Sequence, residues 1–173
     1  MITNIFWLLL ARIATIPAVT EWLIKQSFKT PYDHLPGYMN RWWLIPRRWK
    51  LPYVVRIHHI LRRDLDPFPH DHPGDWRTII LKGQYCEQDV FGSIHLREVG
   101  DTVARQATDF HNIIQVSDGG VWTLFLMRKT HNQWGFMVTN DDGVPVKLHW
   151  EHYISQNGRV DPSRAEFLRS VKS

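Results

Sequence analysis

Short apolar segments separated by turn residues occupy the chain from residue 53 onward, and this pattern limits the fold more than any other. The candidate strands cover 53–61, 76–82, 84–90, 93–98, 102–106, 110–116, 121–128, 134–139 and 144–150. The turns between several of them are marked by Gly83, Gly92, Gly100, Asp118-Gly119-Gly120 and Asp141-Asp142-Gly143. Strands this short, with brief connections, predict an all-β fold, an antiparallel barrel or sandwich.

The amino-terminal residues predict two α-helices instead. We expect one helix over 3–16 and a second over 17–28, with Pro17 in the first turn of the second. The apolar run 5–11 is too short to span a bilayer, which takes about 20 residues, so no transmembrane segment is expected. Both helices are predicted to pack on the main domain. The alternative is a peripheral membrane contact through an interfacial patch at residues 6–8.

Proline and glycine interrupt residues 30–52, which the sequence predicts to be an irregular arm. This arm interleaves basic residues with tryptophan, over 38–43 and again over 47–50. Such a mixture can bind single-stranded nucleic acid by phosphate contacts and base stacking, but packing of the tryptophans on the barrel is the favoured interpretation. The predicted organisation is an amino-terminal part (1–52), a barrel (53–155) and a tail (156–173) with a short helix from Asp161.

Charge and cysteine content limit the partners and the compartment. The 173-residue chain has a net charge of +4, which permits an anionic ligand without demanding one. Cys86 is the single cysteine, so an intramolecular disulfide is excluded. A reducing compartment such as the cytoplasm is therefore expected.

The segment around His70-Asp71-His72 carries the clearest chemical signal. Two residues at positions i and i+2 of an extended segment point to the same side, because strand side chains alternate. The imidazoles of His70 and His72 can therefore meet at one metal ion, while Asp71 points away from it.

The spacing around these histidines resembles the two cupin motifs. In the first motif His-x-His is followed by three or four residues, a Glu, six residues and a Gly; here Trp76 stands at the Glu position and Gly83 at the Gly position. In the second motif the ligand His stands at a fixed distance after a Gly, and Gly100 and His111 match it. The Pro, inner Gly and Asn of that motif are replaced. The resemblance implies a jelly-roll barrel with metal ligands His70, His72 and His111.

A longer stretch, from Gly37 to about Tyr153, also resembles small cupin-like proteins of bacteriophages and prophages. The resembling segments are 38–43, 56–58, 70–73, 80–83, 100–102, 118–122 and 134–136. This resemblance supports the fold and the metal site but supplies no reaction, since one fold serves many chemistries.

The missing Glu leaves a divalent ion with three neutral imidazoles and open coordination positions. Cupins of the thiol dioxygenase type share that ligand set, which favours Fe(II) and a dioxygenase-like oxidoreductase; Zn, Ni or Mn in a non-redox isomerase, epimerase or lyase, or a binding module, are the alternatives. Asp75 is expected to be a second-sphere acceptor or, alternatively, a fourth ligand.

A ligand pocket is predicted beside the metal, lined by Arg56, His58, Trp76 and Tyr85. Arg56 and His58 share a strand face, and a guanidinium there would bind a carboxylate or phosphate. The expected partner is thus a small anionic molecule. A homodimer is a further expectation, because cupins often pair through sheet edges or amino-terminal arms.

Overall fold

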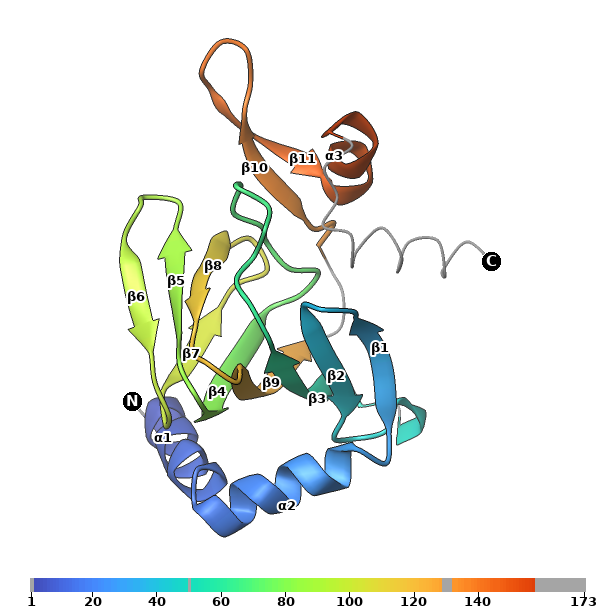
Figure 1. Ribbon diagram of the computed structural model, residues 1–173, viewed down its shortest axis with the longest axis vertical. Coiled ribbons are helices and arrows are strands. Elements are labelled where there is room, and N and C mark those ends of the chain that lie inside the picture. Colours follow the sequence, from blue (N-terminus) through green and yellow to red (C-terminus); the bar gives the residue numbers. More distant parts are fainter. Residues whose placement is uncertain (1, 50, 129–131, 158–173) are drawn as a thin grey trace.

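The computed structural model describes residues 2–49, 51–128 and 132–157 (Figure 1). The helices are α1 (Ile2–Ala14), α2 (Pro17–Ser27), the short 3-10 helix η1 (Arg47–Trp49) and α3 (Trp150–Asn157). The strands are β1 (Pro31–Leu35), β2 (Met39–Trp43), β3 (Tyr53–Ile60), β4 (Trp76–Lys82), β5 (Tyr85–Asp89), β6 (Ile94–Arg97), β7 (Thr102–Arg105), β8 (His111–Val116), β9 (Val121–Arg128), β10 (Gly135–Thr139) and β11 (Pro145–His149). All predicted strands from residue 53 onward are present, with bounds that differ by at most one residue.

The strands form two facing sheets and a hairpin. The larger sheet has the order β1-β2-β3-β9-β4-β7, the smaller has the order β6-β5-β8, and β10 pairs with β11. Every strand pair is antiparallel, and β9 lies between β3 and β4 although it follows both in the chain. Such crossed connections between two antiparallel sheets define a jelly roll. The predicted all-β jelly roll with amino-terminal helices is therefore confirmed.

The predicted irregular arm over 30–52 is wrong in its first half, because these residues form β1 and β2. β2 pairs with β3 from Met39↔Ile60 to Trp43↔Arg56, and β1 adds the edge strand. Pro31 is tolerated because it begins an edge strand, where its missing N–H breaks no ladder bond. Pro36 and Gly37 lie between the two strands, and Gly37 has a φ of 70°. The prolines therefore mark an edge hairpin.

The carboxyl-terminal end of the barrel also differs from expectation. Residues from Trp150 form the helix α3, where the sequence predicts only strand and coil. The short helix expected from Asp161 lies outside the described residues.

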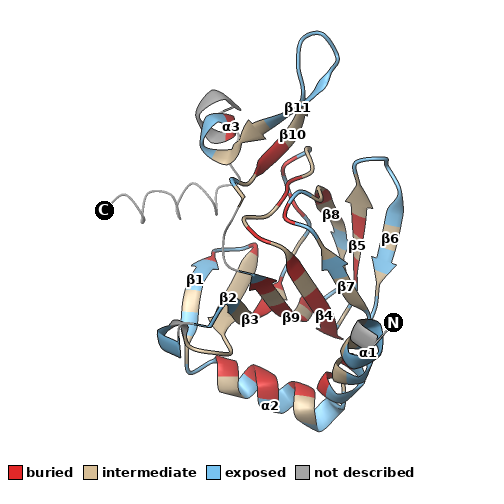
Figure 2. Cartoon of the chain, turned by 180° about the vertical axis from the view of Figure 1, so that it is seen from behind, coloured by how far each residue is buried: buried red, intermediate tan, exposed pale blue. Residues whose placement is uncertain are grey.

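The middle strands of the large sheet, β3, β9 and β4, are covered on both faces, which gives the molecule three layers (Figure 2). Alternate residues of β3, β4 and β9 point outward against α1 and α2 and form one apolar cluster: Ala11, Ala14, Leu23, Ile24, Ile57, Ile79, Leu81 and Leu124. The intervening residues point toward the small sheet, where the second cluster gathers: Leu35, Tyr38, Ile60, Ile80, Tyr85, Ile113 and Val121. The predicted packing of both helices on the barrel is confirmed.

No single described helix is long and apolar enough to cross a membrane. Asn4–Ala14 and Pro17–Ser27 reach that length and apolar content only together, as a pair bent by 85°.

Candidate metal centre and ligand cavity

Backbone pairing brings His70 beside His111. The His70 N–H donates to the His111 carbonyl at 2.9 Å, and the His111 N–H donates to the His70 carbonyl at 3.0 Å. Two residues that exchange both bonds in an antiparallel bridge lie directly opposite, with their side chains on the same face. His72 is at i+2 from His70, so alternation turns its side chain to that face as well.

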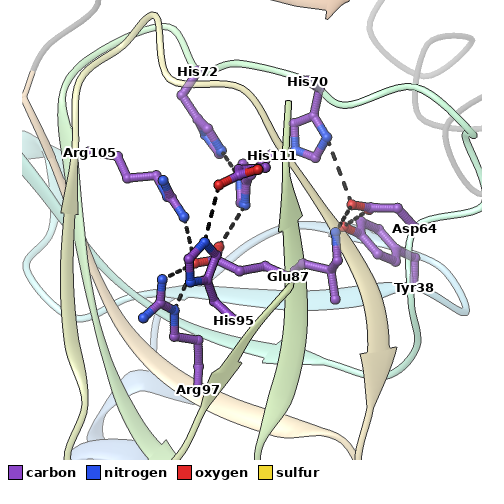
Figure 3. A network of polar contacts seen from close by, with 11 residues as sticks. Tyr38, Asp64, His70, His72, Glu87, His95, Arg97, Arg105 and His111 are labelled. Carbon is purple, nitrogen blue, oxygen red and sulfur yellow. Dashed lines mark hydrogen bonds and ion pairs between the residues drawn. The ribbon is translucent and has the colours of Figure 1, made fainter. Parts of the chain in front are cut away.

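The three imidazoles converge, with His70 and His111 buried and His72 half-buried (Figure 3). One ligand nitrogen of each lies within 4.8 Å of the others, and the Nε2 atoms of His72 and His111 are 3.0 Å apart. His70 and His111 are 8% and 4% exposed. Buried imidazole nitrogens without competing water suit Fe, Zn, Ni or Cu, so the donor set fits a divalent transition metal.

Glu87 on β5 fixes the orientation of His111. Its Oε2 lies 3.0 Å from His111 Nδ1, while its Oε1 accepts hydrogen bonds from Arg97 at 2.7 Å and Arg105 at 2.6 Å. Burial alone raises the pKa of Glu87, but the hydrogen bond and charge of His111 and the charge of Arg105 outweigh it and lower the pKa to about 2. An ionised carboxylate accepts the Nδ1–H, which leaves the Nε2 lone pair of His111 aimed at the cluster.

Asp64 stands behind His70 in a similar way. Its Oδ2 is 3.8 Å from His70 Nδ1 and accepts a hydrogen bond from the Ile113 N–H at 2.8 Å. Its Oδ1 accepts the hydroxyl proton of Tyr38. Two of the three histidines therefore have a buried carboxylate beside the nitrogen that faces away from the cluster.

Neither of these carboxylates was among the residues predicted from the sequence. For Glu87 a signal was available, because it lies at i+2 from the inward-facing Tyr85 and so had to point into the barrel. Asp64 lies in a connection without alternation, and no comparable signal placed it.

Asp71 anchors the segment that carries the two histidines. It is fully buried and points away from them, as expected; it accepts hydrogen bonds from the Gly135 N–H at 2.7 Å and the Asn132 side chain at 3.0 Å, and it pairs with Lys147. The loop is thereby tied to β10 and β11.

Asp75 is not one of the residues whose ligand atoms converge in this group. Its Oδ1 accepts a hydrogen bond from the Ala107 N–H at 2.9 Å, so the contact it makes is with the backbone ahead of β8.

A cavity of about 380 Å³ opens beside the three histidines, and all four predicted pocket residues line it. Arg56 and His58 on β3 and Trp76 on β4 belong to the large sheet, and Tyr85 on β5 belongs to the small sheet that faces it. The remaining wall is largely apolar or aromatic and includes Leu35, Met39, Ile60, Phe125 and Met127.

Arg56 is held in the cavity wall by aromatic rings. Its guanidinium lies 4.1 Å from the ring centre of Tyr32 and 4.5 Å from that of Trp43. Burial lowers the pKa of Arg56 to about 10, so the side chain stays charged at neutral pH. Contacts with two aromatic rings hold the guanidinium in place, so its N–H groups are preorganised to donate hydrogen bonds to an anion.

Three buried nitrogens in this cavity wall have no hydrogen-bond partner among the described residues: Arg56 Nε, His58 Nε2 and Trp76 Nε1. Burial lowers the pKa of His58 well below its usual value, with Arg56 and Arg41 adding to the effect, so His58 is neutral. Buried donors are normally satisfied, because each unpaired one costs about 1–3 kcal/mol. Their position beside the cluster suits a bound polar molecule.

The other arginines near the motifs have different partners. Arg105 is committed to Glu87, and Arg77 points outward, where its guanidinium lies 4.6 Å from the ring centre of Trp7 in α1.

No protein-family model matches the chain, and no curated protein matches its sequence. Among solved structures it is similar to the polyketide cyclase RemF from Streptomyces resistomycificus, with 13% identity and a TM-score of 0.49 over 62% of this chain and 76% of that one. A cupin-like protein from Thermotoga maritima has 15% identity and a TM-score of 0.47, over 62% of this chain and 86% of that one. A cupin-2 domain from Rhodospirillum rubrum has 14% identity and a TM-score of 0.45, over 76% of this chain and 78% of that one. These values assign the chain to no family, and its resemblance to phage and prophage proteins stays a prediction.

Proposed function

We propose that the chain is a cupin-type, metal-dependent enzyme that acts on a small anionic molecule, and that it is an oxidoreductase of the dioxygenase kind. The observation that carries the proposal is the meeting of three imidazoles, two of them buried, and three unpartnered buried nitrogens in the wall of one cavity. Ferrous iron held by three neutral imidazoles would supply redox chemistry toward dioxygen and leave coordination positions for substrate.

The charge of the cavity supports an anionic substrate. Neutral imidazoles cancel none of the charge of a divalent ion, and the buried Glu87 is already balanced by Arg97 and Arg105. Arg41 and Arg56 add two more positive charges to the lining. A carboxylate or phosphate would offset this excess in a site of low dielectric constant.

The residues of the chain would position such a substrate. Arg56 Nε would donate to the anionic group, and Trp76 Nε1 would donate to a second acceptor. His58, which is neutral, would donate or accept at Nε2 according to its tautomer. Apolar walls around Phe125 and Met127 would exclude water and strengthen each of these hydrogen bonds.

Metal analysis of protein purified without a histidine tag tests the proposal, together with an oxygen-electrode assay. We expect bound iron and oxygen uptake with the substrate, and loss of the metal in His111→Ala. His152→Ala, in the exposed part of α3, is the matched control and should keep it. Bound zinc, nickel or manganese without oxygen uptake would contradict the oxidoreductase and favour a non-redox isomerase, epimerase or lyase. If the protein is well folded but binds no metal, the proposal of a metal-dependent enzyme is wrong, and a non-catalytic binding module is the remaining alternative.

A further inference from the structure

The outward face of α1 is apolar, although it points away from the barrel. Ala11 and Ala14 are buried against the sheet, yet Phe6, Leu8 and Ile13 on other sides of the helix are 56%, 54% and 54% exposed. Arg12 is the only charged residue of α1. A surface helix of a globular protein normally presents polar residues to water, so this face is built for another environment.

α2 continues this surface and adds positive charge. Its exposed residues include Trp22, which is 57% exposed, and the basic Lys25, and the exposed Lys29 lies two residues after its end. Figures 1 and 2 show α1 and α2 one after the other along the bottom of the molecule, and their axes are bent by 85°. We call the exposed side chains Ile5, Phe6, Leu8, Leu9, Ile13 and Trp22 the apolar helix face.

The segment that builds this end is positively charged. Residues 1–29 contain three basic residues, Arg12, Lys25 and Lys29, and one acidic residue, Glu21. Glu21 already lies 3.7 Å from Lys82. The apolar helix face is thus part of a basic segment.

We propose that α1 and α2 are the docking surface for a bilayer that carries anionic lipid headgroups. The 13 residues of α1 extend about 20 Å, less than the roughly 30 Å hydrocarbon core. A helix of this length lies in the interface, with its apolar residues in the acyl boundary and its basic residues at the headgroups.

Charge favours this occupant over a second copy of the chain. A symmetric dimer through the apolar helix face would bring two basic segments together, whereas an anionic leaflet attracts each nearby Lys or Arg. The surface also lies on the outer side of the large sheet, while the ligand cavity lies on the inner side. Docking therefore leaves the cavity free, and the proposal does not depend on any activity.

Vesicle sedimentation with the full chain tests the proposal. We expect the wild type to partition onto phosphatidylcholine vesicles that contain phosphatidylglycerol, more weakly onto pure phosphatidylcholine, and less as salt rises. F6S/L9S should lower the partition coefficient by at least about tenfold, since it removes two large apolar side chains from the contact. F91S is the matched control, because Phe91 is 90% exposed in the β5–β6 turn, and it should change nothing.

A second variant removes charge and leaves the apolar residues in place. K25Q/K29Q should weaken binding to the anionic vesicles by about fivefold per charge and leave binding to neutral vesicles unchanged. If thermal unfolding shows that F6S/L9S is misfolded, K25Q/K29Q still tests the docking proposal. The proposal is overturned if the wild type stays in the supernatant, if F6S/L9S or K25Q/K29Q binds anionic vesicles as the wild type does, or if sedimentation shows a dimer that F6S/L9S dissociates.

Discussion

Glu87 links the charge of the barrel interior to the orientation of His111, one of the proposed metal ligands. It is fully buried and contacts His111, Arg97 and Arg105 at once. Replacing it by Gln keeps the shape but removes the charge that holds the proton on His111 Nδ1. We expect Glu87→Gln to lower metal affinity by about 10–100-fold, the usual effect of losing such a partner. Competition with a metal chelator measures this, with the exposed Glu98→Gln as control; equal affinities for the two variants would remove Glu87 from the site.

In the proposed function, recognition of the anion depends on Arg56. Arg56→Met retains much of the apolar contact with Tyr32 and Trp43 but loses the charge. We expect it to weaken binding of simple carboxylates and inorganic phosphate to the metal-loaded protein by about 2–3 kcal/mol. Metal content should not change. Calorimetry against Arg77→Met, whose guanidinium points outward, makes the comparison; the same affinity in both variants would place the anion elsewhere.

His58 should make the stability of the metal-free protein depend on pH. Its pKa is well below the usual value because of burial, and Arg56, Arg41 and His72 lower it further. The unfolded chain takes up a proton on this residue below about pH 6.5, whereas the folded chain does not. The unfolded state then binds more protons, so stability falls as pH drops below that value, by up to about 1.4 kcal/mol per pH unit.

His58→Gln isolates that contribution. Urea unfolding at several pH values should show a steeper loss of stability on acidification in the wild type than in His58→Gln, since the other histidines titrate in both. Parallel pH profiles would mean that His58 is protonated in the folded protein.

Among the elements, strands that alternate in polarity were predictable, and edges and connections were not. β3, β4 and β9 have one apolar or aromatic residue at almost every second position, so the sequence locates them and places Arg56 and His58 on a common face. β1 has an exposed face and begins with Pro31, which reads locally as coil. Its pairing with β2 is a tertiary effect that the local pattern does not contain.

The same distinction applies to the candidate site. The i, i+2 spacing predicted that His70 and His72 share a side, and the cupin motif added His111. The link between His70 and Phe136 on β10 is an isolated bridge between distant segments. The sequence contains no signal for that bridge. It therefore predicts β10 and β11 as two strands but not that their hairpin holds the histidine segment in place.

Gly135 on β10 tests that role of the hairpin. A Cβ there would lie 2.2 Å from the carbonyl oxygen of Leu148 on β11, so Gly135→Ala must push the strands apart. The Gly135 N–H also donates to Asp71, between the two histidines. We expect a loss of about 1–3 kcal/mol of stability, typical of overpacking, and weaker metal binding. Thermal unfolding and chelator competition measure the two effects, and Val144→Ala, at an exposed end of the hairpin, is the control; unchanged metal binding in Gly135→Ala would separate the hairpin from the site.

At the scale of the molecule, the three histidines come from two distant parts of the chain. His111 belongs to β8 in the small sheet, whereas His70 and His72 lie in the connection between β3 and β4 of the large sheet. A metal bound by all three would therefore bridge the two sheets at the mouth of the barrel. Because the unfolded chain does not preform such a site, binding free energy adds to folding free energy.

Metal binding should accordingly stabilise the whole fold. With the free ion at 100 times its Kd, the free energy of unfolding should rise by about 2.7 kcal/mol, and the increase should grow with the logarithm of the metal concentration. His111→Ala should unfold at the same denaturant midpoint with and without metal, while His152→Ala should respond as the wild type does. Denaturant unfolding under anaerobic conditions with ferrous iron, and separately with zinc, measures the effect. If neither ion changes the denaturant midpoint of the wild type, the cluster does not bridge the sheets through either of them.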